Sequence, residues 1–323
     1  LTLCGWIGGT FTIAGGVELR SAVLVGVGLA AFGLGLGCAE VAFNIDGAEV
    51  ERLLGRPILP FLHGAFSIGT LLGGGAGIWL AAINYPPASQ LAIAGGIAVV
   101  VAVAVTRDLP PGFAVQAQDR STAAGPRAWR DGRVVRIALI VLVLALAEGT
   151  ANDWLPLVMV DGHGLEQSTS SIVYTTFAAA MAAGRFAGPA VLARFPRVGV
   201  VATSGCFAAL GLLGVVFSPS LPLAYAAVVL WGLGAALGFP VSISAAAEGD
   251  AATAPSRVGV VATTGYIGFL VGPPMLGLLG DHFGLRQSLV IVLALVLTAV
   301  VLAPAVRPLA TNPATTAQKE KKA

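Results

Sequence analysis

Residues 33–57, GLGLGCAEVAFNIDGAEVERLLGRP, decide how the rest of this chain is organised. The stretch predicts an apolar, glycine-rich helix that carries Glu40, Asn44 and Asp46 into a region with the composition of lipid-embedded protein. A carboxylate at bilayer depth costs about 2.5–3.5 kcal/mol on insertion scales, so such groups usually face a bundle interior or a water-filled cavity. Glu40 is therefore the first candidate site residue.

Spacing places this carboxylate on a small-residue face of the helix. The face carries four residues at intervals of four, three and four, which are Gly33, Gly37, Glu40 and Asn44. Small residues let a neighbouring membrane helix approach closely, so we expect an interhelical seam that also holds a polar pair. The alternative to a buried functional site is a carboxylate near the cytoplasmic end of the helix whose side chain extends to water. Asp46 and Glu49 fit that alternative well.

Composition places the chain among polytopic membrane proteins. Of its 323 residues, 56% are hydrophobic and 11% are charged, whereas globular domains average about 25% charged residues. Three cysteines lie in apolar runs, Cys4, Cys38 and Cys206, and they predict small core residues rather than a disulfide framework or a metal site. Leu1 lies in an apolar run without an initiator Met, which indicates that the sequence is cut at its front.

Ten apolar runs near the length of a spanning helix predict an all-α membrane bundle. They lie at about 1–16, 21–46, 58–83, 89–106, 134–159, 168–193, 197–217, 221–247, 257–280 and 285–306.

Basic residues predict the orientation of these spans. One alternate set of breaks, together with the C-terminal tail and Arg185 near one break, holds all of the 18 Lys and Arg residues except Arg20 and Arg286. Basic loops stay in the cytoplasm, so we expect a cytoplasmic C-terminus and a location in the plasma membrane, the inner membrane of a bacterium. The expected regions are a partial N-terminal bundle (1–106), a cytoplasmic linker (107–133), a six-helix bundle (134–306) and a tail (307–323).

An internal repeat accounts for the unequal halves. Phe32-Gly33-Leu34-Gly35 recurs as Trp231-Gly232-Leu233-Gly234, and Ile68-Gly69-x-x-x-Gly73 recurs as Ile267-Gly268-x-x-x-Gly272, both at an offset of 199. A shared offset between two helix pairs favours parallel repeats. Carried backward, it predicts that roughly 65 residues and two helices precede residue 1, as in a transporter built from two six-helix halves.

Four segments carry a resemblance to a known family. They are Gly35-Leu36-Gly37-Cys38-Ala39-Glu40-Val41-Ala42-Phe43-Asn44, Phe61-Leu62-His63-Gly64-Ala65-Phe66-Ser67-Ile68-Gly69, Ala147-Glu148-Gly149-Thr150-Ala151-Asn152-Asp153-Trp154 and Gly265-Tyr266-Ile267-Gly268-Phe269-Leu270-Val271-Gly272-Pro273-Pro274. The chain resembles a major facilitator superfamily transporter, within the branch of the L-fucose:proton symporters and their bacterial relatives. The resemblance implies helices 3–6 of the N-terminal bundle and all six of the C-terminal bundle, ten of twelve in all.

The resemblance also implies roles for individual residues. In that family the Glu of the fourth helix is associated with substrate binding and proton coupling. The resemblance implies the same role for Glu40 and, more weakly, for Asn44. His63 stands at a position where the resemblance would lead us to expect a Gln, so the resemblance does not imply that this chain carries the same sugar. Gly184-Arg185-Phe186-Ala187-Gly188 loosely resembles the cytoplasmic loop motif of the superfamily, with Pro189 where its acid is expected.

Helical spacing supplies further candidates without the resemblance. Glu148 and Asn152 lie four residues apart on one face and can hydrogen-bond a hydroxylated solute or a neighbouring helix. His63 titrates in a range that suits proton coupling, although a buried histidine bonded to backbone is the commoner case. Weaker cavity candidates are aromatic side chains, which more often serve packing or the membrane interface: Trp154, Tyr174 and Tyr266.

These observations predict a secondary active transporter of a small polar, sugar-like solute, proton-coupled and working by alternating access. Expected partners are the solute, protons and the lipid bilayer, with no nucleic acid, and the chain is expected to be a monomer. No enzyme motif, cofactor site or metal site is predicted. The alternatives are an efflux transporter of drugs or metabolites in the same superfamily, and a transporter-like sensor that binds without transport.

Overall fold

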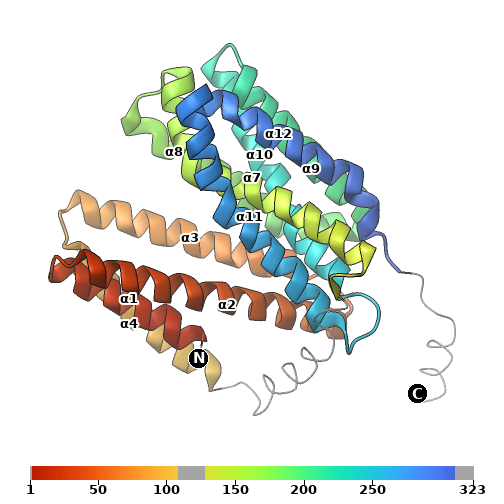
Figure 1. The fold of residues 1–323 in the computed structure, drawn as a ribbon, viewed down its shortest axis with the longest axis horizontal. Coiled ribbons are helices and arrows are strands. Elements are labelled where there is room, and N and C mark those ends of the chain that lie inside the picture. The colour runs from red at the N-terminus through yellow and green to blue at the C-terminus, as the bar shows by residue number, and fades with distance from the viewer. Residues whose placement is uncertain (1, 108–127, 310–323) are drawn as a thin grey trace.

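The computed structural model describes residues 2–107 and 128–309, and these residues form ten α-helices with no β-strand among them (Figure 1). The N-terminal group comprises α1 (Thr2–Glu18), α2 (Ala22–Leu54), α3 (Leu59–Ala82) and α4 (Pro87–Thr106). The C-terminal group comprises α7 (Gly132–His163), α8 (Gln167–Arg194), α9 (Arg197–Phe217), α10 (Leu221–Ala247), α11 (Ala254–Phe283) and α12 (Leu285–Leu302), followed by the short 3-10 helix η1 (Ala303–Val306). The predicted all-α architecture of four helices followed by six is confirmed. Most of the predicted linker and tail, residues 108–127 and 310–323, lies outside the described residues.

Every predicted span corresponds to one of these helices. In the described part of the chain, eight helices are long and apolar enough to cross a membrane, and α1 and α3 are not among the eight. The largest difference in bounds is at α2, which continues eight residues beyond the predicted end at 46, to Leu54. Apolar periodicity stops where Glu49 and Arg52 begin, but the ion pair between these side chains, three residues apart, supports a further helical turn.

Capping groups explain where several helices begin and end. The Ser21 hydroxyl accepts a hydrogen bond from the Leu24 backbone N–H at 3.3 Å, and Gly55 ends α2 in the left-handed conformation at φ 65°. Glu51, near the end of α2, accepts hydrogen bonds from the backbone N–H groups of Ile58 and Leu59 at 3.0 and 3.1 Å. The end of α2 is therefore tied to the beginning of α3 across a four-residue turn.

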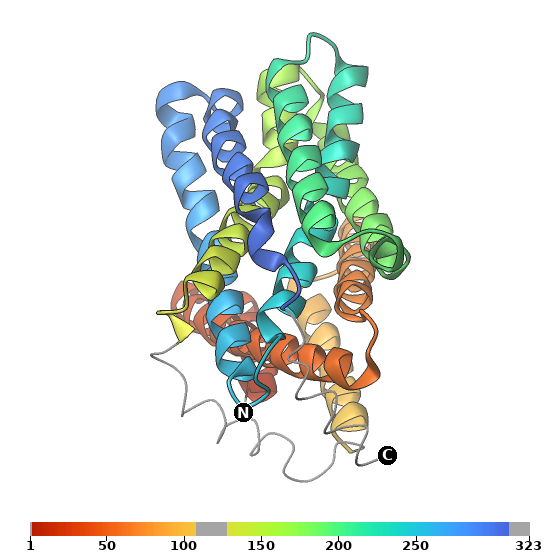
Figure 2. The same ribbon diagram turned by 90° about the vertical axis from the view of Figure 1, so that its right-hand side faces the viewer.

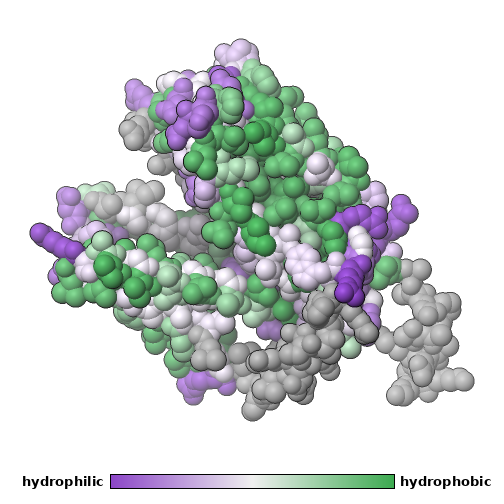
Figure 3. All heavy atoms as spheres, viewed as in Figure 1, coloured by the Kyte–Doolittle hydropathy of each residue, from purple (hydrophilic) through white to green (hydrophobic). Residues whose placement is uncertain are grey.

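The two groups of helices meet at one end and diverge toward the other. α2 packs against α11, and α3 packs against α8 and α10. Figures 1 and 2 show the groups converging near the α2–α3 and α10–α11 connections. Away from that end a wedge opens between them, and Figure 3 shows this wedge as a hollow in the surface.

Arginines gather at the closed end. Arg133 and Arg197 both pair with Glu248, directly after α10. Arg257 donates hydrogen bonds to three backbone carbonyls at the end of α10, including that of Ala246 at 2.9 Å. Cations stabilise the negative end of a helix dipole, so this end of α10 is held firmly where the two groups meet. The basic ends that the sequence assigns to one side of the membrane therefore lie together.

The repeat is visible in the order and packing of the helices. Shifted by 199, the helix starts at residues 22 and 87 fall at 221 and 286, and α10 starts at 221 and α12 at 285. α1 packs on α2 and α4, just as α9 packs on α10 and α12. The four N-terminal helices thus correspond to the last four helices of the C-terminal group.

Close helix packing involves a different face of α2 from the one predicted. A Cβ atom added at Gly35 would lie 2.2 Å from the backbone N of Trp6 in α1, and one added at Gly28 would lie 2.7 Å from that of Ile13. Gly33 and Gly37 have no atom within 4 Å of such a Cβ and line a cavity instead. The expected seam on the Gly33–Gly37 face was wrong, because spacing identifies a shared face without identifying its neighbour.

The three cysteines are also placed differently from the prediction. Cys4, Cys38 and Cys206 are free and exposed rather than packed in the core. Lipid-facing surfaces of a membrane protein are apolar too, so an apolar run does not distinguish its buried face from its exposed face.

Substituting alanine at two glycines of α2 tests this packing. Gly35→Ala should lower the free energy of unfolding by about 1–3 kcal/mol, because the added methyl forces the α1 backbone away. Gly37→Ala, two residues further along the same helix, meets open space and should cause no loss of stability. Equilibrium unfolding of the detergent-solubilised protein measures both effects. Equal stability of the two variants would contradict the α1–α2 contact.

Candidate functional site

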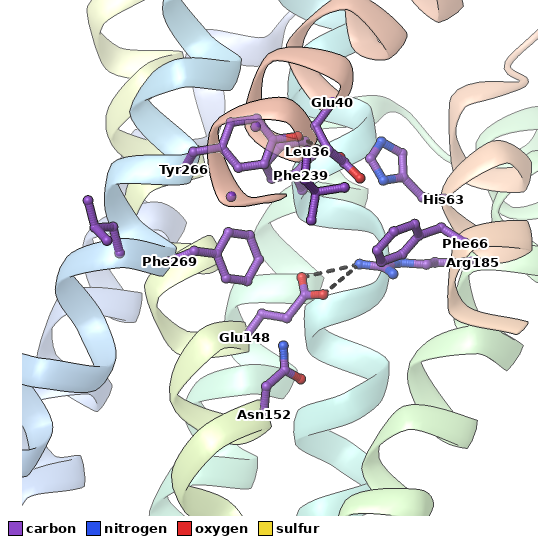
Figure 4. A pocket seen from close by; sticks show the side chains of 13 residues that line it. Leu36, Glu40, His63, Phe66, Glu148, Asn152, Arg185, Phe239, Tyr266 and Phe269 are labelled. Carbon is purple, nitrogen blue, oxygen red and sulfur yellow. Dashed lines mark hydrogen bonds and ion pairs between the residues drawn. The ribbon is translucent and has the colours of Figure 1, made fainter. Parts of the chain in front are cut away.

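A cavity of about 530 Å³ lies between the two groups of helices. Its polar lining comes from five helices and consists of Glu40, His63, Glu148, Asn152, Arg185 and Tyr266. Apolar side chains from α2, α3, α10 and α11 complete the wall, including three phenylalanines, Phe66, Phe239 and Phe269 (Figure 4). Both halves of the protein therefore contribute charged groups to one shared cavity.

A hydrogen-bonded chain joins α2 to α11 and α3 on one side of the cavity. The Tyr266 hydroxyl donates to Glu40 Oε2 at 2.7 Å and accepts from Asn44 Nδ2 at 3.2 Å. Asn44 Nδ2 also donates to the Glu40 backbone carbonyl at 2.9 Å, which fixes the orientation of the amide. Its oxygen therefore accepts from His63 Nε2 at 3.1 Å. Glu40 is thus held by a residue of the opposite half.

A buried ion pair occupies the other side of the cavity. The Arg185 guanidinium donates from one nitrogen to both oxygens of Glu148, at 3.0 and 3.1 Å. Figure 4 shows these two side chains pointing toward each other from α8 and α7. The other terminal nitrogen of Arg185 donates to the Ser67 hydroxyl in α3 at 2.6 Å. Arg185 is 4% exposed, so its charge is taken up almost entirely within the protein.

The structure gathers six of the predicted site residues around this cavity. Glu40, His63, Glu148, Asn152 and Tyr266 line it, and Asn44 lies fully buried directly behind Glu40. Asn152 lies one helical turn from Glu148 on the cavity-facing side of α7 (Figure 4).

Two of the weaker aromatic candidates lie elsewhere. Trp154 donates a hydrogen bond from Nε1 to the Pro273 carbonyl at 3.0 Å, and it does not line the cavity. Tyr174 is partly buried on α8 and is also outside the cavity lining.

Two residues at the site were missed or misplaced by the sequence prediction. Arg185 was assigned to a cytoplasmic loop motif, but it lies within α8 and reaches the cavity. Ser67 was not singled out, although it is 4% exposed and bonds Arg185. An arginine inside an otherwise apolar run is itself a signal of a buried partner. Its partner Glu148 lies 37 residues away and cannot be recognised from spacing.

In the described residues, no three His, Cys, Asp or Glu side chains are close enough to hold a metal ion.

Removing the hydroxyl of Tyr266 tests the link between the halves. Tyr266→Phe should lower the free energy of unfolding by about 1.5–3 kcal/mol, because a bond to a charged group is lost and Asn44 loses an acceptor. Tyr225→Phe is the matched control, since the Tyr225 hydroxyl has no hydrogen-bond partner among the described residues. Denaturant titration compares the two variants, and an equal effect of both would contradict the Tyr266 network.

The buried ion pair gives a second prediction. Arg185→Gln should destabilise the protein by about 3–5 kcal/mol, because it leaves the Glu148 carboxylate without its counter-charge. The double variant Arg185→Gln/Glu148→Gln should regain most of that loss, since two neutral amides replace two charges. Unfolding free energies of the single and double variants give the coupling energy. Strictly additive losses would contradict the pair.

Comparison with known proteins agrees with this architecture. The sequence profile of the Major Facilitator Superfamily matches residues 59–254 and 171–323. An uncharacterized transporter of Sinorhizobium fredii, y4wD, is 31% identical over 289 residues, covering 88% of this chain and 74% of that protein.

Two solved structures share the fold at low sequence identity. The fucose:proton symporter FucP of E. coli superposes with a TM-score of 0.76 at 19% identity, covering 95% of this chain and 84% of the symporter. The human organic anion transporter MFSD10 superposes with a TM-score of 0.74 at 18% identity, covering 94% and 76%. From the profile match and the relative's identity, the chain belongs to the Major Facilitator Superfamily, a family of membrane transporters rather than enzymes.

Proposed function

We propose that this protein is a secondary active transporter that moves a small polar, sugar-like solute by alternating access, with Glu40 as the proton-coupling group. The observation that carries the proposal is the position of Glu40. Its carboxylate lines the cavity, and it is bonded to Tyr266 of the opposite half. A change in the charge of Glu40 therefore changes the strength of its hydrogen bond to Tyr266. This contact between the halves must rearrange when the cavity opens to the other side.

The coupling has a simple electrostatic basis. Closing the cavity over the Glu40 carboxylate would remove the water that solvates its charge, and this cost favours the neutral acid in the closed state. A proton bound from the open side neutralises Glu40 and lowers that cost. Proton movement and the conformational switch are then linked, because each favours the other.

The wedge gives this cycle a starting state. The cavity lies at the junction of the halves, while the arginine-rich end beyond it is closed. With that basic end in the cytoplasm, the wedge is open to the outside and the C-terminal tail is cytoplasmic. The proposed transporter is a monomer in the plasma membrane. In support of proton coupling, one of the solved structures that share this fold is described as a fucose:proton symporter.

The cavity lining offers hydrogen-bonding groups that suit a sugar-like solute. Asn152 offers an amide that can donate and accept hydrogen bonds, and Glu148 and Glu40 offer acceptor oxygens. His63 binds Asn44 and so contributes by orienting the Glu40 network rather than by contacting solute through Nε2. Binding sites of this kind combine an apolar wall with a few polar groups in fixed positions.

A second candidate is export of a more apolar metabolite or drug. The observation favouring it is the share of the cavity wall formed by apolar side chains, among them Phe66, Phe239 and Phe269. Efflux of a preloaded solute from vesicles separates export from uptake. Solute binding without flux in either direction would instead indicate a transporter-like sensor.

Neutralising Glu40 tests the proposed coupling. In the full-length protein reconstituted into vesicles, Glu40→Gln should abolish accumulation driven by a proton gradient while solute exchange at equal pH continues. Asp46→Asn is the matched control, because Asp46 lies on the same helix and is outside the cavity lining. This control should retain accumulation. Gradient-driven accumulation by Glu40→Gln at the wild-type level would reject Glu40 as the coupling site.

A further inference from the structure

The two carboxylates of the cavity have different kinds of partner. Glu148 forms an ion pair with Arg185, and both of its oxygens accept from the guanidinium. Glu40 forms no ion pair with any described residue and accepts one side-chain hydrogen bond, from the neutral hydroxyl of Tyr266. Only one of the two acids therefore has a counter-charge in contact with it.

Arg185 has few donors left for any other ligand. Besides Glu148, it donates to the Ser67 hydroxyl at 2.6 Å and to the Ala236 carbonyl at 3.4 Å. Protonating Glu148 would leave this 4% exposed guanidinium without its counter-charge, which is strongly unfavourable in a low-dielectric interior. Arg185 therefore depends on Glu148 for its counter-charge and makes no hydrogen bond to Glu40.

The charge count of the cavity lining points the same way. Its titratable and charged groups in the described residues are Glu40 from α2, His63 from α3, Glu148 from α7, Arg185 from α8 and Tyr266 from α11. Among these described residues, with His63 neutral, two carboxylates face one guanidinium, so one negative charge has no counter-charge within this set. A proton on Glu40 would remove that charge and lower the cost of closing the cavity over these side chains.

Both carboxylates are connected to the opposite half through positions that the repeat makes equivalent. Tyr266 of α11 reaches Glu40 in the N-terminal half, and Ser67 of α3 is reached by Arg185 from the C-terminal half. Residues 67 and 266 differ by 199, the offset of the repeat. The connection through Tyr266 thus ends on Glu40, which has no ion-pair partner among the described residues. The connection through Ser67 leads to Glu148, which is paired with Arg185.

We propose that Arg185 is the positioning residue that gives the two carboxylates different roles. It holds Glu148 as a fixed counter-charge joined to the other half through Ser67, and it leaves Glu40 as the one of these two acids that takes a proton. In the proton-binding step an O–H bond forms on the Glu40 carboxylate while an O–H bond of a hydronium ion on the open side breaks, which leaves water. The inference rests on the proposed function and adds which of the two cavity carboxylates takes the proton.

Infrared difference spectroscopy tests this assignment without knowledge of the solute. A protonated carboxylic acid has a carbonyl-stretch band that a carboxylate lacks, so acidification of the lipid-reconstituted full-length protein reports each acid that takes a proton. Of the two acids Glu40 and Glu148, we expect only Glu40 to give a band in the wild type, and Glu40→Gln should remove that band. Arg185→Gln should add a second band, and Arg185→Gln/Glu148→Gln should return the spectrum to one band.

Two further variants separate the effect of charge from a structural role. Arg185→Lys keeps the positive charge and should keep a single band. Ser67→Ala removes a neutral partner of Arg185 and should also keep a single band. The double glutamine variant removes both charges, so the measurement remains available if Arg185→Gln alone does not fold.

Different results would contradict the role of Arg185 and the role of Glu40. A wild-type band that the double variant loses would show that Glu148 takes a proton in the presence of Arg185, and this would overturn the proposal. An Arg185→Gln spectrum identical to wild type would overturn it as well. A wild-type spectrum unchanged by Glu40→Gln would overturn the coupling role of Glu40 in the proposed function, while the Arg185 variants still decide the role of Arg185.

Discussion

The structure depends on the requirement that a charge inside a membrane protein must have a partner or water. An ionised side chain surrounded by hydrocarbon is too costly to retain without one. Here the Arg185–Glu148 ion pair lies within the C-terminal half, and hydrogen bonds link both cavity carboxylates to the opposite half. Glu40 receives its hydrogen bond from α11, and Arg185 of α8 reaches Ser67 of α3. The charged groups therefore link the two halves at the cavity, and the proposed alternating access requires these links to rearrange.

Glycine determines where these groups can stand. Gly35 and Gly28 bring α2 into backbone contact with α1, and this packing turns the opposite face of α2 toward the cavity. On that face Gly33 and Gly37 leave open space in front of Glu40. One helix thus carries two sets of glycines, one that packs helices closely and one that keeps a volume free. The equivalent residue Gly234 packs α10 against α9 in the second half, with an added Cβ only 2.2 Å from the Ala208 backbone N.

The repeat provides two similar bundles, and the side chains make them unequal. Position 40 is a glutamate in α2, while its counterpart 199 residues later is Phe239 in α10. Both side chains line the cavity, so one half presents a charge where the other presents an aromatic ring. Of the two carboxylates that line the cavity in the described residues, Glu148 has an ion-pair partner and Glu40 has only the hydroxyl of Tyr266. A symmetric pair of free acids would instead repel each other across the cavity.

Sequence alone determined the membrane-spanning helical class, the number of helices and the four-plus-six arrangement, because apolar run length and the offset of 199 are local or linear properties. It also singled out Glu40, Asn44, His63, Glu148, Asn152 and Tyr266, since polar residues within apolar runs are conspicuous. Only the tertiary structure decided which residues are partners. The Arg185–Glu148 pair, the contribution of Ser67 and the glycine face that packs on α1 depend on how separate helices are turned toward one another. Helical periodicity fixes which residues share a face, but it carries no information about what that face meets.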